Sequence, residues 1–217
     1  MTAARVIRRP STAGWFEEQT SKLDGDLFDQ QDTTSVVVGI DASLTNFGIS
    51  VLDPVSLRHV TVLFKPKLKG AARLNEIYSF VGKAVRRIDD LRGIEHITLE
   101  NYAMGIRGGR TFSIGEGGGA VKLALIHELG VDEQIAYPTL VTPGQVKKFT
   151  TSRGDAKKNE MLLGVYRKWG AEFSSDDQAD SYALSRVAAA VASGQTEFEY
   201  EAAVVAQLER HTEWLKP

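Results

Sequence analysis

A short run of mostly β-branched residues, Val36-Val37-Val38-Gly39-Ile40, constrains the fold of this chain more than any other feature. A continuous apolar run of this length is typical of a strand that is buried on both faces of a sheet. Asp41 follows directly, and a carboxylate at the end of a buried strand is costly unless it is paired, hydrogen-bonded or bound to a cation. The sequence therefore predicts a sheet covered on both faces. Asp41 belongs either to a functional centre at the end of that strand or to a structural turn or cap.

The remaining hydrophobic patterns predict an α/β domain. Two further strands, 47–52 and 59–64, follow after short connections, as in an antiparallel meander. Beyond them, helical patterns with apolar residues three and four positions apart alternate with strands. We expect helices over 70–91 and 121–129 (the latter beginning somewhere after Phe112), strands over 96–99 and 134–141, and helices opening at Pro143 and covering 155–169 and 176–192. This β-β-β-α-β-α-β-α-α order predicts a five-stranded mixed sheet flanked by helices.

Length and composition are those of one domain with extensions. The chain has 217 residues, no cysteine and a formal net charge of −2. The lack of cysteine excludes disulfides, thiolate zinc sites and a cysteine nucleophile. The charge excludes nucleic-acid binding through bulk positive charge, but not through a local basic surface. We expect an N-terminal extension over 1–34, a main domain over 35–193 and an acidic C-terminal helix or tail over 194–217, the tail being a solvated face rather than a site.

No targeting or membrane segment is evident in the sequence. Residues 1–31 carry arginines but no apolar stretch that would complete a signal peptide. No apolar run reaches the ~18 residues that a membrane span needs. We therefore expect a cytoplasmic protein without membrane association.

Four carboxylates occupy positions that a strand end or a helix face can bring together. Glu100 ends the fourth predicted strand as Asp41 ends the first, so the two point into one crevice if those strands are neighbours. Asp177 and Asp180 are three residues apart and share one face of the last long helix. Asp176 and Asp177 could instead complement the helix dipole in its first turn, whereas Asp180 lies one turn further in, near the face expected to pack on the sheet.

Carboxylates without a His, Cys or Ser partner favour oxygen ligation of a hard divalent cation. Mg²⁺ or Mn²⁺ is the natural occupant of a site built from Asp41, Glu100, Asp177 and Asp180, with Asp176 an alternative to Asp177 as third ligand. Two ions about 3.5–4 Å apart are the usual arrangement for phosphodiester hydrolysis. Zinc is disfavoured, because the four histidines show no ligand spacing.

Basic residues gather near the same part of the chain. Residues 143–170 hold seven bases against two acids, and a glycine-rich segment just after Glu100 carries two arginines. Basic loops around a carboxylate cluster suit a polyanionic substrate that is cleaved by metal chemistry. A solvated charged helix face remains the alternative for the lysine-rich stretch. The basic residues that we expect to contact such a substrate are Arg107, Arg110, Lys147, Lys148, Arg153 and Lys157.

Taken together, Gly39-Ile40-Asp41, Leu99-Glu100 and Asp177-Gln178-Ala179-Asp180-Ser181-Tyr182-Ala183-Leu184 resemble the RuvC Holliday junction resolvases over roughly residues 36–192. The resemblance implies the ribonuclease H-like fold and a Mg²⁺-dependent, homodimeric endonuclease that acts on four-way DNA junctions, with no nucleotide cofactor. It implies that Asp41, Glu100, Asp177 and Asp180 are the metal-binding carboxylates. The segment Arg153-Gly154-Asp155-Ala156-Lys157-Lys158 is similar to the family segment that places the active-site lysine, here Lys158. Residues 114–120 are similar to the family segment at the dimer and DNA side.

Two departures from the family pattern affect the expected substrate. The aromatic residue that unstacks the junction comes three residues after the glutamate in the family, and this chain has Ala103 there. Tyr102 or Phe112 could substitute for it. The extension over 1–34 is also unusual for the bacterial pattern. Both features suggest a divergent, bacteriophage-encoded member, active in a bacterial cell or phage-infected host, with a substrate range that extends to other branched DNA.

Other classes of protein share parts of this pattern. An actin-like ATPase or sugar kinase also begins with a strand ending in Asp, but it needs a second similar half that 217 residues scarcely accommodate. A non-catalytic junction-binding protein is opposed by the presence of all four acids. A nuclease of the same fold that cuts RNA–DNA hybrids is the close alternative.

Overall fold

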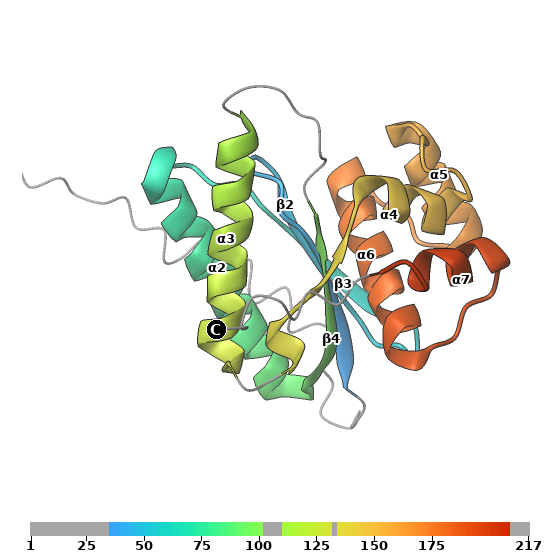
Figure 1. The fold of residues 1–217 in the computed structure, drawn as a ribbon, viewed down its shortest axis with the longest axis horizontal. Helices are drawn as coiled ribbons and strands as arrows, with labels where there is room; N and C mark the ends of the chain where they lie inside the picture. Colours follow the sequence, from blue (N-terminus) through green and yellow to red (C-terminus); the bar gives the residue numbers. More distant parts are fainter. Residues whose placement is uncertain (1–34, 102–109, 132–133, 209–217) are drawn as a thin grey trace, which may run out of the picture.

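The chain forms a five-stranded mixed sheet with helices on both faces (Figure 1). The computed structural model describes residues 35–101, 110–131 and 134–208. The strands are β1 (Val36–Asp41), β2 (Phe47–Leu52), β3 (His59–Phe64), β4 (Ile94–Glu100) and β5 (Thr139–Val141). They lie in the order β3-β2-β1-β4-β5, with β2 antiparallel to β1 and β3, and β4 parallel to β1 and β5. The predicted mixed sheet and its opening meander are confirmed.

The helices form one layer on each face of the sheet. They are α2 (Gly70–Arg92), α3 (Arg110–Leu129), α4 (Pro143–Thr151), α5 (Lys158–Trp169), α6 (Asp176–Ser193) and α7 (Glu199–Val205), with a short 3₁₀ turn η3 (Gln134–Ala136). Helices α2 and α3 pack together against one face. Helix α6 lies directly on β1, β2 and β4 at the other face, and α4, α5 and α7 pack around it.

The alternation of side chains along β1 separates the two faces. Val36, Val38 and Ile40 belong to the apolar core beneath α2 and α3. The intervening positions face α6, where Val37 packs against that helix and Gly39 meets its backbone. Because successive side chains of a strand point to opposite faces, the residue after Ile40 points toward α6. The predicted doubly covered strand thus directs Asp41 to the α6 side of the sheet.

Small residues let α6 approach the sheet closely. A Cβ on Gly39 would clash with the backbone of Ser181 and Ser185 in α6, and one on Gly48 in β2 would lie 2.9 Å from the Ser181 side chain. The buried Thr98 hydroxyl of β4 donates a hydrogen bond to the Leu184 carbonyl of α6, 2.7 Å away. Helix α6 is therefore fixed against three strands at backbone distance.

Several predicted boundaries were wrong. Helix α3 begins at Arg110 rather than after Phe112, and β4 begins at Ile94 rather than at His96. The fifth strand begins at Thr139 rather than at 134, because Pro138 has no N–H for the ladder and the chain before it curls into η3. Helix α5 begins at Lys158 rather than at 155, since Lys157 is its N-cap and Glu160 accepts a hydrogen bond from the Lys157 N–H, 2.6 Å away.

The acidic segment after 194 is not simply a solvated face. Its helix α7 buries Val204 and Glu201, and Glu201 forms an ion pair with Lys168 of α5. The many acidic residues of the segment predicted a solvated surface, so the sequence did not indicate this packing. The extension over 1–34 lies outside the described residues. No helix in the described part of the chain combines the length and the apolar character that crossing a membrane requires.

Candidate active site

Asp41 and Glu100 lie side by side at the ends of two neighbouring parallel strands. The register pairs Ile40 of β1 with Leu99 of β4, so the next residue of each strand is an acid. Asp41 is only 5% exposed and shares a hydrogen bond with Glu100. Burial, and then the charge of Glu100, raise the pKa of Asp41 well above its usual value. Burial is also the main cause of the raised pKa of Glu100. The prediction that the two acids share a crevice is consistent with this geometry.

The first two turns of α6 bring further carboxylates to the same place. Ser175 is the N-cap of α6, and its hydroxyl accepts a hydrogen bond from the Gln178 N–H at 3.3 Å. Asp180 lies one turn in. Burial, followed by the charges of Glu100, Asp176 and Asp177, raises its pKa to about 7. Asp180 therefore lies close enough to Glu100 on β4 for their charges to interact.

Asp177 and Asp176 have different surroundings, although they are adjacent. The Asn46 side-chain amide, in the turn between β1 and β2, donates a hydrogen bond to Asp177 Oδ2 at 2.9 Å. Asp177 also contributes to the raised pKa of both Asp41 and Glu100. Asp176 instead forms an ion pair with Lys158, which lowers its pKa. Of the two alternatives for the third ligand, Asp177 is the one oriented toward the strand-end acids.

Sequence reasoning missed Asn46, and it named Lys147 as a DNA contact without connecting it to the carboxylates. Asn46 lies in the short connection between the first two predicted strands, where an amide near a strand-end acid is a suitable partner for a second carboxylate. Lys147 of α4 lowers the pKa of Glu100 through its charge, so it lies at the edge of the cluster. Lys158 is largely exposed, and its pKa is raised by the hydrogen bond to Asp176 and more weakly by Asp177 and Asp180.

The donor set fits a hard divalent cation. Asp41, Glu100, Asp177 and Asp180 offer only oxygen, and burial together with the negative charges of neighbouring acids raises the pKa of Asp41, Glu100 and Asp180. A bound cation would offset that repulsion. Among residues 35–101, 110–131 and 134–208, no group of three or more His, Asp or Glu side chains is arranged so that it could hold a metal ion as it stands. The cluster is thus one of converging acids rather than a preformed cage.

The predicted DNA-binding residues are spread around this cluster. Tyr102 and Arg107 lie outside the described residues, and of Arg110 only the helical backbone is described. Phe112 is 78% exposed on α3. Lys147 and Lys148 are half-buried on α4.

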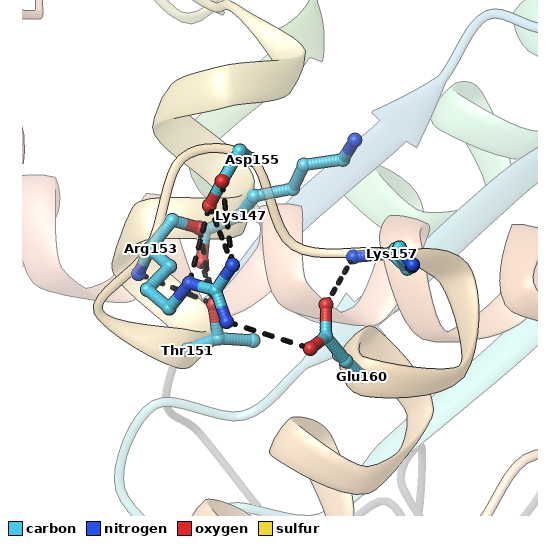
Figure 2. A network of polar contacts seen from close by, with 6 residues as sticks. All are labelled: Lys147, Thr151, Arg153, Asp155, Lys157 and Glu160. Atoms are coloured by element: carbon cyan, nitrogen blue, oxygen red, sulfur yellow. Dashed lines mark hydrogen bonds and ion pairs between the residues drawn. The ribbon is translucent and has the colours of Figure 1, made fainter.

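The turn between α4 and α5 carries the other two predicted contacts (Figure 2). Arg153 bonds to Asp155 at 3.2 Å and forms an ion pair with Glu160 at 3.5 Å. Lys157 is exposed, and its N–H donates to Glu160. Lys147 extends away from this network in Figure 2. The turn therefore carries exposed basic residues and is stabilised by these hydrogen bonds and ion pairs.

A glycine also shapes the rim of the site. A Cβ on Gly117 of α3 would lie 2.7 Å from Leu44 Cδ2, in the turn that follows Asp41. Gly117 belongs to residues 114–120, which by resemblance correspond to the family segment at the dimer and DNA side. The close approach that the structure shows for Gly117 is to this turn.

Comparison with known proteins gives matches only among solved structures. No protein-family model matches the sequence, and no curated protein matches it. The structure of Thermus thermophilus RuvC aligns with a TM-score of 0.53 at 22% identity, over 69% of this chain and 90% of that one. The complex of the same RuvC with a Holliday junction substrate aligns with a TM-score of 0.53 at 22% identity, over 70% and 90% of the two chains. The yeast mitochondrial Holliday junction resolvase gives a TM-score of 0.44 at 15% identity, over 88% of each chain.

The similarity to the two RuvC structures identifies the fold. The order β3-β2-β1-β4-β5, with α6 against its centre, is that of the ribonuclease H-like α/β class. Within that class, the chain has the fold of RuvC, as its sequence motifs predicted.

Proposed function

We propose that this protein is a divalent-metal-dependent endonuclease that resolves Holliday junctions and related branched DNA. The observation that carries the proposal is the convergence of Asp41, Glu100, Asp177 and Asp180 from β1, β4 and α6 at one end of the sheet. The RuvC fold, one of whose structures was determined with a Holliday junction substrate, supports the choice of substrate. Two Mg²⁺ or Mn²⁺ ions per site, and action in the cytoplasm of a bacterial or phage-infected cell, remain predictions.

Each part of the site has a distinct role in the proposed reaction. The four carboxylates would hold the metal ions, which would supply Lewis-acid stabilisation of the charge that develops at the scissile phosphate. Lys158 stands at the rim on the first turn of α5 and contacts that phosphate once substrate displaces Asp176 from it. Lys147, Lys148, Arg153 and Lys157 hold the flanking backbone without reading sequence. Phe112, exposed at the start of α3, is available to stack on an opened base pair.

Resolution of a four-way junction needs two coordinated cuts, and we propose a homodimer for this purpose. Helix α3 offers a suitable face. Leu123 is 63% exposed, and a Cβ on Gly115 or Gly119 would meet open space. A Leu123→Glu variant should be monomeric by light scattering, and it should cut one strand without coordinated cutting of the second.

The proposed activity is tested with a labelled four-way junction and a duplex of the same sequence, each incubated with Mg²⁺ or Mn²⁺. We expect symmetric nicks in the junction only, abolished by Asp41→Asn and by Asp180→Asn. The matched control is Asp90→Asn on α2, on the opposite face of the sheet, which should cut normally.

The other outcomes distinguish the alternatives. Cutting of an RNA–DNA hybrid in preference to the junction would favour the hybrid nuclease. Tight junction binding without cleavage in either ion would favour a non-catalytic junction-binding protein. Equal cutting of junction and duplex would refute structure selectivity.

A further inference from the structure

Helix α7 is fastened to the domain by a buried lysine that the proposed reaction does not use. Lys168 of α5 is 8% exposed, forms an ion pair with the 4%-exposed Glu201, and donates a hydrogen bond to the Phe149 carbonyl. Its Nζ lies 4.9 Å from the ring centres of Phe149, Trp169 and Tyr200. Cation–π contacts of this kind strengthen as they lose solvent. Lys168 thus ties α4, α5 and α7 together.

The same contacts hold an exposed aromatic stack in place. The rings of Phe198 and Tyr200 are 5.2 Å apart with an angle of 11° between them, and Lys168 Nζ also lies 5.4 Å from the Phe198 ring. Phe198 nevertheless remains 46% exposed. Because Lys168 holds the two stacked rings in place and Phe198 is open to solvent, the pair is a preorganised surface on which another aromatic ring, such as a nucleic-acid base, can stack.

The aromatic pair forms one wall of a cavity of about 450 Å³ between α4, α5 and α7. Arg153 and Arg167 lie on its lining with Phe198 and Tyr200, and Leu163 is one of its apolar residues. Arg153 is engaged with Asp155 and Glu160, whereas Arg167 is exposed and has no ion-pair partner in the described part of the chain. The combination of a π-surface with an uncompensated guanidinium matches a base attached to a phosphate.

The cavity is continuous with the basic turn next to the candidate active site. Arg153 belongs both to the cavity and to the α4–α5 turn in Figure 2, and the following residues of that turn lead to Lys157 and Lys158. Among the acids near the cavity, Glu160 lines it and is paired with Arg153, and Glu199 is exposed between Phe198 and Tyr200 in the sequence. Glu201 is paired with Lys168, and Glu197 lines a different cavity, together with Arg186.

We propose that this cavity, called the groove below, binds a single-stranded nucleotide segment of the DNA substrate, with a base stacked on Phe198 and its phosphate on Arg167. The inference rests on the proposed function, because it makes the groove an extension of the same DNA path. It gives the acidic C-terminal segment a role in holding unpaired DNA next to a branch point. Aromatic stacking tolerates any base, so the groove recognises single-strandedness rather than sequence.

The test measures binding of fluorescein-labelled oligothymidylate by fluorescence anisotropy in EDTA, where no cleavage occurs. Phe198→Ala should weaken binding about 5-fold or more, since stacking contributes about 1–3 kcal/mol per base, and Phe198→Trp should restore it. Arg167→Gln should weaken binding and reduce the slope of log affinity against log salt by about 0.7. The matched controls are Tyr166→Ala and Arg87→Gln, an exposed aromatic and an exposed arginine outside the cavity lining.

A second measurement locates the contact directly. Oligothymidylate carrying 5-iodouracil, irradiated on the full-length protein, should cross-link to the peptide that contains Phe198 and Tyr200. Wild-type affinity in both Phe198→Ala and Arg167→Gln would overturn the inference. If Phe198→Ala also lowers the unfolding temperature, Arg167→Gln alone decides.

The result separates this inference from the proposed function. If the groove variants bind oligothymidylate normally while the protein cleaves junctions, the groove inference is refuted and the proposed nuclease function stands. If oligothymidylate binding depends on the groove residues but the protein cleaves no DNA, the proposed nuclease function is refuted and the groove inference stands.

Discussion

Gly39→Ala should damage the fold and the candidate site together. Gly39 lies in the middle of β1 where α6 crosses it, and a Cβ there would clash with the backbone N of Ser185 and the backbone O of Ser181. It would also lie 2.7 Å from the Leu184 carbonyl carbon, against an ordinary contact of 3.4 Å or more. These are backbone atoms of a helix, so no side chain can rotate away. Relieving the Leu184 contact alone requires α6 to withdraw by about 0.7 Å.

The size of both effects follows from this displacement. Overpacking of a close interface costs typically about 1–3 kcal/mol, and a rigid backbone contact places Gly39→Ala near the upper value. For a domain of this size, about 3 kcal/mol lowers the unfolding temperature by roughly 6–12 °C. Helix α6 carries Asp177 and Asp180, whereas Asp41 and Glu100 stay on the sheet. Because a shift near 1 Å can cost about 100-fold in rate, junction cleavage should fall by about 10- to 100-fold.

Thermal unfolding followed by circular dichroism, and cleavage rates measured well below the unfolding temperature, test this prediction. The matched control is Gly82→Ala on α2, where the added Cβ would lie 3.2 Å from the end of the flexible Glu128 side chain. Alanine is favoured over glycine inside a helix by about 1 kcal/mol, so the control should be neutral or stabilising. Wild-type stability and activity in Gly39→Ala would refute the backbone-distance packing of α6.

Four further predictions concern charged groups. Asp41→Asn removes one charge from a cluster of buried carboxylates, so in EDTA it should unfold at a higher temperature than wild type while losing cleavage; a lower unfolding temperature would contradict the repulsion. Arg92→Met leaves the buried Asp53 without its 3.0 Å ion pair and should cost about 3 kcal/mol in urea unfolding. Burial raises the pKa of Asp53, but hydrogen bonds from two backbone N–H groups and from Arg92 outweigh this effect, so the pKa in the folded protein is below its usual value. The stability that ionised Asp53 contributes is therefore fully present above its unfolded pKa and is lost as the pH falls through the lower folded pKa. Asp53→Asn should therefore lose less stability than wild type between about pH 5 and pH 2. Lys168→Met should destabilise by about 3 kcal/mol through the unpaired Glu201, and adding Glu201→Leu should recover much of that loss.

Most of the fold could be predicted from the sequence because its signals are local. The apolar run before Asp41 and the two strands after it gave β1 to β3 with nearly correct ends. Boundaries failed where a single residue decided them. Pro138 has no N–H for the sheet, and Lys157, as N-cap, shortens a helix that composition alone extended to 155.

The site could be predicted only in part, since its geometry comes from distant residues. The strand-end positions of Asp41 and Glu100 are visible in the sequence, because a buried strand that ends in an acid is a local pattern. The preference for Asp177 over Asp176 depends on Asn46, which is 131 positions away in the chain. The burial of Glu201 depends on Lys168, and no periodicity of α7 indicates it.

Docking of α6 and assembly of the carboxylate cluster are one structural event. The sheet face beneath α6 carries Gly39, Gly48 and Thr98, which offer little apolar area but allow backbone contact, whereas the opposite face holds the larger apolar core. The α6 interface therefore gains less from apolar burial than the α2–α3 interface, and it also brings like charges together. A divalent cation bound across the cluster would join β1 and β4 to α6 and offset that repulsion. Metal binding should accordingly slow amide hydrogen exchange most strongly in α6, and least in α2 and α3, because only the α6 interface contains its ligands.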